Sequence, residues 1–486
     1  MKKIETDLAI IALGAAGLAA SVQAAELGLK VVAFEKSPVV GGVANMGGGP
    51  FAVGTKFQKD HGINITKEEV FDMFMDYTHW YSDGQLVRDY VWKSADTIEW
   101  LENMGVEFEG TAKYYSGGES TWFIVKREDG KSSRAGSASF MNKKIFEKAK
   151  DLGVEIHLKT PVVKITKDDE RVTGLVAKNA DSEEIRVEAK AVIVATGGFG
   201  NNVEMIKEYT GYTYGEDMYN FRIPAMTGDG LKMAWAVGAG KSRMTLEKFA
   251  SPIVPQSCFS IMVYFMQPHL MVNLQGERFF NEGCIENAAV TSNALDIQEK
   301  KCGFLICSED TIRYFKNNGT DFPSEVFKGD LKTLFDEHVE KSIKNSPESI
   351  CVANSIEEIA EHFHINVDNL KKTVEQYNSY CDKHHDELFN KKSEFLRPIR
   401  GNKLYGVRIA SSAYGSLGGI KINHKTEVLT DDFNIIPGLY GAGNDVCDIY
   451  GGTYLYKIPG NSMGFAINTG RIAAENVAKY IKSLSD

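Results

Sequence analysis

One segment near the N-terminus, residues 8–35, reads LAIIALGAAGLAASVQAAELGLKVVAFE and is the most informative part of the chain. Its first residues, Leu8–Leu13, form a short apolar run of the kind found in buried parallel strands. Gly14–Gly17 end this run, and the alanine-rich segment Leu18–Leu27 then takes helical spacing. Val31–Glu35 predicts a second strand. A strand, a glycine turn, a helix and a second strand form a βαβ unit, which predicts an α/β fold with a parallel sheet.

This unit carries part of a dinucleotide-binding fingerprint. Such a site places a pyrophosphate at the N-terminus of the first helix, where free N–H groups favour an anion and side chains would block its approach. Gly14 and Gly17 supply the second and third glycines, but Ala12 stands where the first is expected, and we expect it to be tolerated with a negative φ. Glu35 lies near the spacing of about 20 residues at which a carboxylate meets the ribose hydroxyls. The alternative for Glu35 is a solvated strand end.

Strands and glycine clusters return later in the chain. Val154–Ile165, Arg171–Ala177 and Ile185–Ala195 predict successive strands, and the glycine cluster Thr196–Gly200 follows the last of them directly. Glycines at that place indicate close approach of the backbone to a ligand.

The middle of the chain has a different pattern. Residues 245–412 lack strand–glycine–helix units and carry amphipathic helices, predicted at Ile356–Phe363 and Asn369–Lys383. The first pattern returns near Gly438–Gly443, and Phe465–Lys482 predicts a closing helix. The sequence therefore predicts one discontinuous domain, residues 1–244 and 413–486, with an insertion at residues 245–412.

The composition is that of an ordinary globular protein and excludes several partners. At 486 residues the chain is too long for one core, because single cores stop growing at roughly 250–300 residues. A net charge of -10 gives no basic surface for nucleic acid or anionic membranes. The seven cysteines show no metal-ligand or haem spacing, so we predict reduced thiols and no metal site.

The N-terminus shares some features with a signal peptide. Lys2 and Lys3 precede an apolar run, but Glu5 and Asp7 interrupt the basic part, and the run resolves into a strand, a turn and a helix. No later apolar stretch approaches the ~20 residues needed to cross a bilayer. We therefore expect a cytoplasmic protein.

Several ordered motifs together resemble one family. They are Ala12–Gly17, Gly41–Gly42 with Gly47–Gly49, Ala195–Gly200, Thr227–Gly230, Val272–Glu282 and Gly438–Gly443. In this order they resemble the fumarate reductase and succinate dehydrogenase flavoprotein family, including its 3-ketosteroid dehydrogenase branch, over nearly the whole chain. The resemblance implies an FAD-binding Rossmann-like domain of the glutathione-reductase type, with an inserted α+β capping domain for the substrate.

The resemblance also implies which residues hold FAD. They are Gly14, Gly17, Glu35, Lys36, Gly41, Gly42, Gly48, Val162, Gly197, Asp229, Gly443, Asn444, Ser462 and Met463. Relatives usually carry glutamate at the Asn444 position, for the ribityl chain. Relatives with covalent FAD use a histidine after the second strand, and Val43–Val53 contains none, so non-covalent FAD is expected.

The same resemblance assigns the catalytic residues. Counting from Asn281-Glu282, Glu286 takes the place of the fumarate reductases' proton-donating arginine, so we expect it to be the proton partner. The loop from Tyr456 to Gly464 is similar to the ketosteroid branch, where a tyrosine hydroxyl and a glycine N–H polarise a ketone. Tyr456 and Gly460 inherit those roles. Fixed donors there would stabilise the enolate charge that develops.

The substrate is expected to differ from fumarate. The family's histidine-containing substrate segments have no counterpart here, Tyr414-Gly415-Ser416 replaces one of them, and Lys457 stands where a substrate arginine is expected. Aromatic residues are available to cover an apolar substrate, with core packing as the alternative for each: Tyr114, Tyr115, Trp122, Tyr264 and Phe265.

We therefore predict an FAD-dependent oxidoreductase that reduces, or introduces, a C=C bond conjugated to a carbonyl, by hydride transfer at flavin N5. The partners are a small carbonyl-conjugated molecule and an external electron donor or acceptor. Two alternatives stay open: a non-redox FAD-dependent isomerase or hydratase, and a flavin-bearing binding or electron-carrying subunit that needs a partner.

Overall fold

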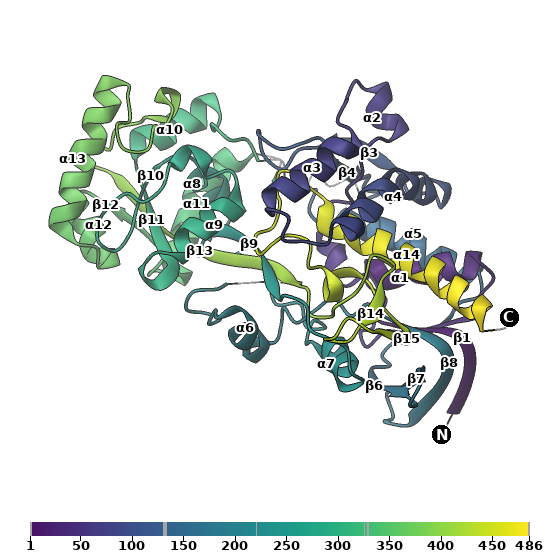
Figure 1. Ribbon diagram of the computed structural model, residues 1–486. Helices are drawn as coiled ribbons and strands as arrows, with labels where there is room; N and C mark the ends of the chain where they lie inside the picture. Colours follow the sequence, from purple (N-terminus) through teal and green to yellow (C-terminus); the bar gives the residue numbers. More distant parts are fainter. Residues whose placement is uncertain (1, 130–133, 220, 325, 328–329, 485–486) are drawn as a thin grey trace.

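The computed structural model describes residues 2–129, 134–219, 221–324, 326–327 and 330–484. These residues form two lobes (Figure 1). The main domain contains the segments before residue 245 and after residue 417, and both ends of the chain lie in it. The cap contains residues 245–417 and lies to one side of the main domain.

An eight-stranded sheet forms the centre of the main domain, with the order β14-β15-β8-β1-β2-β5 and the hairpin β6-β7 beside β8. β1 is parallel to both β2 and β8, and β15 is parallel to β8, so strands from the two ends of the chain share one sheet. The strands are β1 (Lys2–Ile11), β2 (Val31–Phe34), β5 (Glu155–His157), β6 (Val162–Lys167), β7 (Val172–Lys178), β8 (Glu184–Val194), β14 (Glu427–Leu429) and β15 (Ile435–Gly441).

Two helices from opposite ends of the chain pack together in the main domain. α1 (Ala15–Glu26) is rich in alanine and almost wholly buried, so α14 (Asn461–Ser483) can approach it closely. A side chain at Gly470 would overlap with the carbonyl oxygen of Ala16. The remaining elements of this domain are the hairpin β3 (Phe108–Ala112) and β4 (Trp122–Val125), with α2 (Lys56–Asp60), α3 (Lys67–Tyr77), α4 (Gly84–Asn103), α5 (Ala138–Asp151), α6 (Val203–Thr210) and α7 (Asp229–Ala236).

The cap is built on a five-stranded sheet of order β10-β11-β13-β12, with β9 paired to β13. Its strands are β9 (Thr245–Pro252), β10 (Leu270–Val272), β11 (Cys302–Ser308), β12 (Ile350–Ala353) and β13 (Leu404–Leu417). Its helices are α8 (Phe259–Phe265), α9 (Ala288–Asp296), α10 (Glu309–Asn318), α11 (Leu331–Asn345), α12 (Ile356–Phe363) and α13 (Val367–Lys383). β9 enters the cap and β13 leaves it, so both crossings between the lobes are strands.

A buried ion-pair cluster joins separate segments of the cap. Arg278 contacts Glu282 at 2.7 Å and Asp386 at 2.9 Å, and Lys391 lies 3.5 Å from Glu282. Removing one partner of such a cluster leaves an uncompensated buried charge. Arg278 and Glu282 of the Val272–Glu282 motif therefore stabilise the cap.

The α/β architecture predicted from the sequence is confirmed, and the predicted helix Ile356–Phe363 coincides with α12. The single strand predicted at Val154–Ile165 is wrong: it is two strands, β5 and β6, because a turn containing Lys159 at φ 52° and then Pro161 separates them. The domain boundary predicted between residues 412 and 413 falls inside β13 and stays a prediction.

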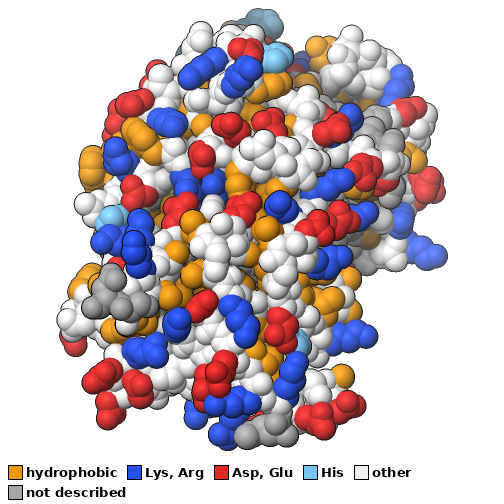
Figure 2. Space-filling model, turned by 90° about the vertical axis from the view of Figure 1, so that its right-hand side faces the viewer, with side chains coloured by type: hydrophobic (Ala, Val, Ile, Leu, Met, Phe, Trp, Pro, Cys, Tyr) orange, Lys and Arg blue, Asp and Glu red, His pale blue; other side chains and the backbone are white. Residues whose placement is uncertain are grey.

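Charged side chains of both signs alternate over the face drawn in Figure 2. Among the described helices, none combines the length and the apolar character that a bilayer span requires.

Candidate active site

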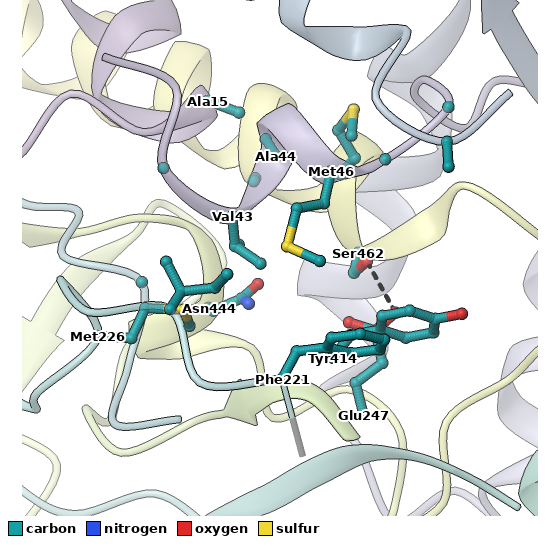
Figure 3. A pocket seen from close by; sticks show the side chains of 18 of the residues that line it. Ala15, Val43, Ala44, Met46, Phe221, Met226, Glu247, Tyr414, Asn444 and Ser462 are labelled. Atoms are coloured by element: carbon teal, nitrogen blue, oxygen red, sulfur yellow. Dashed lines mark hydrogen bonds between the residues drawn. The ribbon is translucent and has the colours of Figure 1, made fainter. Parts of the chain in front are cut away.

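One large cavity, of about 560 Å³, is lined by residues of both the main domain and the cap. In Figure 3, Ala15 and Ala44 line one end of it, whereas Glu247, Tyr414 and Phe221 gather at the other. We call these the nucleotide end and the substrate end.

The nucleotide end begins at the N-terminus of α1. Gly14 is the N-cap of this helix, and a side chain added to it would meet nothing within 4 Å, so open space lies in front of the helix. Free N–H groups and the dipole favour an anion there. Gly17 was also expected to hold FAD, but it is not among the residues that line the cavity. It packs against Ala12 instead, and a Cβ at this position would overlap with the Ala12 carbonyl oxygen.

Ala12 has a φ of 77°, so the negative angle expected from the sequence is wrong. Its N–H donates to the Phe34 carbonyl at 2.7 Å, which holds the residue in a left-handed turn between β1 and α1. This conformation costs an L-residue with a Cβ roughly 1–2 kcal/mol. The first position of the fingerprint therefore keeps the geometry of a glycine while carrying an alanine.

Glu35 lies at the end of β2, buried and facing the cavity. Its carboxylate accepts hydrogen bonds at 2.8 Å from the N–H groups of Leu13 and Ser37. A carboxylate oxygen has more than one acceptor site, so both oxygens can still accept from ribose hydroxyls. Glu35 thus lies where the spacing rule expects it, and its contact with the ribose stays a prediction.

Lys36 and Asp229 line the cavity and bind each other. The Lys36 ammonium lies 2.6 Å from the Asp229 carboxylate and 2.7 Å from the Thr227 hydroxyl. Burial alone would raise the pKa of Asp229, but hydrogen bonds from Lys36 and Thr227 outweigh it and lower the pKa. The Asp229 carboxylate therefore stays ionised at the edge of the nucleotide end.

The other residues predicted to hold FAD also line this cavity: Gly41, Gly42, Gly48, Val162, Gly197, Gly443, Asn444, Ser462 and Met463.

Asp445, which sequence reasoning missed, fixes one side of the cavity. Its buried carboxylate accepts hydrogen bonds from the backbone N–H groups of Thr196, Gly197 and Gly198. This carboxylate ties the glycine cluster after β8 to the C-terminal segment. An open helix N-terminus, a ribose-type carboxylate and backbone-lined walls fit FAD.

The substrate end centres on Glu247, a residue of β9 that sequence reasoning also missed. Its side chain is buried, and its Oε1 accepts a hydrogen bond of 3.2 Å from the Ser462 hydroxyl. Burial raises the pKa of Glu247 to about 7, and hydrogen bonding from Ser462 and Tyr454 opposes the shift. The sequence around it, Leu246-Glu247-Lys248-Phe249, gives no signal that separates it from an ordinary charged pair in a strand.

Four tyrosines from three separate segments surround this carboxyl: Tyr114, Tyr414, Tyr454 and Tyr456. Burial raises the pKa of the Tyr456 hydroxyl well above its usual value, and this hydroxyl has no hydrogen-bond partner within the described residues. The Tyr456 ring lies 4.6 Å from that of Tyr114 and 4.7 Å from that of Tyr454. Tyr414 stacks on Phe249 at 4.5 Å. A buried, unpaired hydroxyl facing a cavity is available to a ligand.

Glu286 lines the cavity at a partly exposed position in the cap. Its carboxylate accepts a hydrogen bond from the Ser116 hydroxyl and one of 3.2 Å from the Ser116 N–H. Nearby, Asn287 donates to the Tyr115 hydroxyl at 3.4 Å. These contacts join the cap to the loop between β3 and β4.

Gly460 is the N-cap of α14 at φ 80°, and it lines the cavity. Its carbonyl accepts from Phe51 and Gly464, each at 2.9 Å. A side chain here would lie 2.7 Å from the ring of Trp122, so only glycine fits.

Three residues considered for the substrate in the sequence lie outside the cavity. Tyr264 packs in the core of the cap, with its ring 5.0 Å from that of Phe335, because its face of α8 points away from the opening. Phe265 lies in the same core. Lys457 does not line the cavity, and its carbonyl accepts from the N–H of Glu119 at 2.7 Å. A substrate role for these residues therefore has no support from their position and stays an untested prediction.

The charge of the cavity is unusual for a site that binds dicarboxylates. Among the described residues that line it, Lys36 is the single basic side chain, and it is paired with Asp229. The substrate end carries Glu247 and Glu286 instead. Cations there would be needed to bind two carboxylates.

Comparison with known proteins agrees with this arrangement. The family model described as FAD binding domain matches residues 7–462. The vinyl phenol reductase of Lactiplantibacillus plantarum is 31% identical over 489 residues, 98% of this chain and 96% of that protein. A flavocytochrome c3 fumarate reductase in its open conformation superposes with a TM-score of 0.72 at 27% identity, covering 98% of this chain and 79% of the other.

The 3-ketosteroid-Δ4-(5α)-dehydrogenase of Rhodococcus jostii RHA1, solved with 4-androstene-3,17-dione, has the same fold. Its TM-score is 0.77 at 23% identity, covering 98% of both chains. The family resemblance read from the motifs is confirmed. The chain therefore belongs to the FAD binding domain family, as a flavoprotein of the fumarate reductase group.

Proposed function

We propose that this flavoprotein reduces a C=C bond in a neutral, ring-bearing substrate, where the double bond is conjugated to a carbonyl or to a phenol ring. The chain is a flavin-dependent oxidoreductase that acts on carbon–carbon double bonds, as its relatives are. The vinyl phenol reductase and the fumarate reductase both work as reductases, which favours reduction here.

The charge of the substrate end carries this proposal. Glu247 and Glu286 would repel a dicarboxylate, and no described arginine or histidine lines the cavity to offset that repulsion. Tyr114, Tyr414 and Phe249 offer flat aromatic surfaces to a ring. A neutral aromatic or alicyclic molecule therefore fits better than fumarate.

The protein residues then share the work around the double bond. When bound, FAD supplies the hydride. The unpaired hydroxyl of Tyr456, with the N–H of Gly460, donates to the oxygen on which negative charge develops. Glu286 gives a proton to the carbon that does not receive the hydride. Both assignments start from the family resemblance and from the position of each group at the cavity.

FAD is proposed to be bound without a covalent link, because Val43–Val53 carries no histidine. We propose that an external donor reduces the flavin. The FAD cleft is the redox site that the described part of the structure indicates, and the flavin in it must itself receive electrons before it can reduce a substrate. The non-redox isomerase and the electron-carrying subunit would not release stoichiometric reduced product from a single turnover.

The proposal is tested by reducing the purified protein anaerobically and mixing it with alkenes. We expect 4-vinylphenol or a cyclic enone to reoxidise the flavin in one turnover, with the saturated product found by mass spectrometry. Fumarate should reoxidise it at least about 10²-fold more slowly, because each unmatched buried charge costs several kcal/mol. Fumarate reacting as fast as the best neutral alkene would contradict the proposal.

A further inference from the structure

We infer that Glu247 is a catalytic acid–base group that takes up the proton of a phenolic hydroxyl on the substrate, so that the preferred substrates are para-hydroxylated styrenes. This inference rests on the proposed function and names its substrate class. It assigns a role to a residue outside the sequence motifs.

The position of Glu247 supports this role. It comes from the cap strand β9, yet its carboxylate bonds to Ser462 at the start of α14 in the main domain. Figure 3 shows it beside Tyr414 at the substrate end of the cavity. A substrate held between the lobes therefore meets this carboxyl at one end.

The surroundings of Glu247 suit a phenol. Its neighbours with titratable groups are Tyr114, Tyr414, Tyr450, Tyr454, Tyr456 and Cys447, and each of these has a pKa raised by burial. Among the described residues that line the cavity there is no arginine or histidine, and Lys36 is paired with Asp229 at the nucleotide end. A substrate carboxylate would thus find no positive partner, whereas a neutral hydroxyl can donate to the carboxylate of Glu247.

A carboxyl buried without a cation is costly unless it has a function. The structure gives Glu247 hydrogen bonding from Ser462 and Tyr454 and no ion pair among the described residues. A purely structural role would be served as well by glutamine. A pKa near 7 suits a group that both takes and returns a proton at neutral pH.

The proposed reaction has two stages. Glu247 removes the phenolic proton while a proton is added to the terminal vinyl carbon, which gives the para-quinone methide, a neutral tautomer whose exocyclic C=C is conjugated to a C=O. A hydride then adds to the carbon next to the ring, the ring becomes aromatic again, and the oxygen becomes a phenolate. Glu247 returns its proton to that oxygen. The net change is one hydride and one proton added to the C=C bond, giving the ethylphenol.

This scheme explains why two acid–base groups and a free donor line one cavity. Glu247 acts at the oxygen, Glu286 acts at the terminal carbon, and the Tyr456 hydroxyl stabilises the oxygen as it gains charge. A styrene without the hydroxyl cannot form the quinone methide. Its double bond is then not polarised toward the hydride.

The experiment compares 4-vinylphenol with its methyl ether in the flavin-loaded enzyme. Anaerobic single-turnover reoxidation by the methyl ether should be about 10²–10⁴-fold slower in the wild type. Glu247→Gln should slow 4-vinylphenol by a similar factor, and it should slow the ether little further, because both changes remove the same proton transfer. Glu357→Gln, on an exposed face of the cap, is the matched control and should leave both rates unchanged.

A second measurement does not depend on turnover. Binding of the product 4-ethylphenol to the oxidised protein should strengthen as the pH rises from 6 to 8, because its O–H donates best to an ionised carboxylate. Calorimetry should find this rise absent in Glu247→Gln. A flat profile in the wild type, or equal reoxidation by 4-vinylphenol and its ether, would overturn the inference. Failure of every neutral alkene to reoxidise the flavin would instead overturn the proposed function.

Discussion

Ala12 introduces backbone strain into the turn between β1 and α1, because it has a Cβ and a positive φ. A glycine there would adopt φ 77° without strain, so Ala12→Gly should remove roughly 1–2 kcal/mol of strain and lose about 0.5–1 kcal/mol through the freer unfolded chain. We therefore expect a small rise in thermal stability of the FAD-loaded protein, measured by calorimetry. Ala20→Gly, inside α1, is the control and should lower it. Equal losses in both variants would show that Ala12 is unstrained.

Removing the Tyr456 hydroxyl tests whether a single donor stabilises the negative charge that develops on the substrate oxygen. Tyr456→Phe keeps the ring contacts with Tyr114 and Tyr454 but removes the buried, unpaired hydroxyl. Loss of one such donor should lower turnover on the order of 10²–10³-fold while FAD stays bound. Steady-state kinetics and the flavin spectrum measure the two effects. Turnover at the wild-type rate would reduce Tyr456 to a packing residue.

Glu247 should make the stability of the protein depend on pH. Its pKa is about 7 in the folded protein against 4.5 when unfolded, so the folded state binds this proton more tightly. The stabilisation is complete below the unfolded pKa and is lost as the pH rises through 7. Glu247→Gln stays neutral, so its unfolding free energy should exceed that of the wild type by up to about 3 kcal/mol above pH 8, and by little at pH 5. Thermal melts at both pH values measure the difference, and a pH-independent difference would contradict the shift.

At the scale of elements, the sequence predicted the nucleotide end better than the substrate end. The residues of β1, α1 and β2 act over short spacings, so Gly14 and Glu35 could be placed by counting. Glu247 could not be placed in this way. Its role depends on β9 lying against the start of α14, more than 200 residues further on, and local patterns carry no information on such contacts.

The contact between Glu286 and Ser116 allows an element-scale test of the proton-donor assignment. Glu286→Gln should slow the chemical step by roughly 10²–10⁴-fold if the carboxyl transfers a proton, without changing flavin reduction by dithionite. Ser116→Ala removes the same contact between the cap and the β3–β4 loop but keeps the carboxyl. Rapid-mixing reoxidation kinetics should therefore show a large effect in the first variant and a small one in the second. Equal effects would indicate that the pair only closes the cap.

At the scale of the whole molecule, the two ends of the chain jointly line the cavity proposed to hold FAD, with walls from α1, the glycine segment after β8, η5 (Gly443–Val446) and α14. Unfolding the main domain should therefore release FAD completely, since no histidine is available in Val43–Val53 for a covalent bond. Acid precipitation should leave a colourless pellet and a yellow supernatant, checked by absorbance. Flavin that stays with the pellet after washing in denaturant would show a covalent link.

The buried carboxyl at the substrate end also offers a way to screen for the natural substrate. Above pH 7 the empty protein holds a poorly compensated negative charge, and a ligand that donates a hydrogen bond to it removes part of that cost. Such ligands should raise the melting temperature more at pH 8 than at pH 6, whereas ligands that only fill the aromatic walls should raise it equally at both. A library of plant-type phenols and enones, melted at two pH values, would therefore separate hydroxyl donors from simple apolar binders without any knowledge of the electron donor.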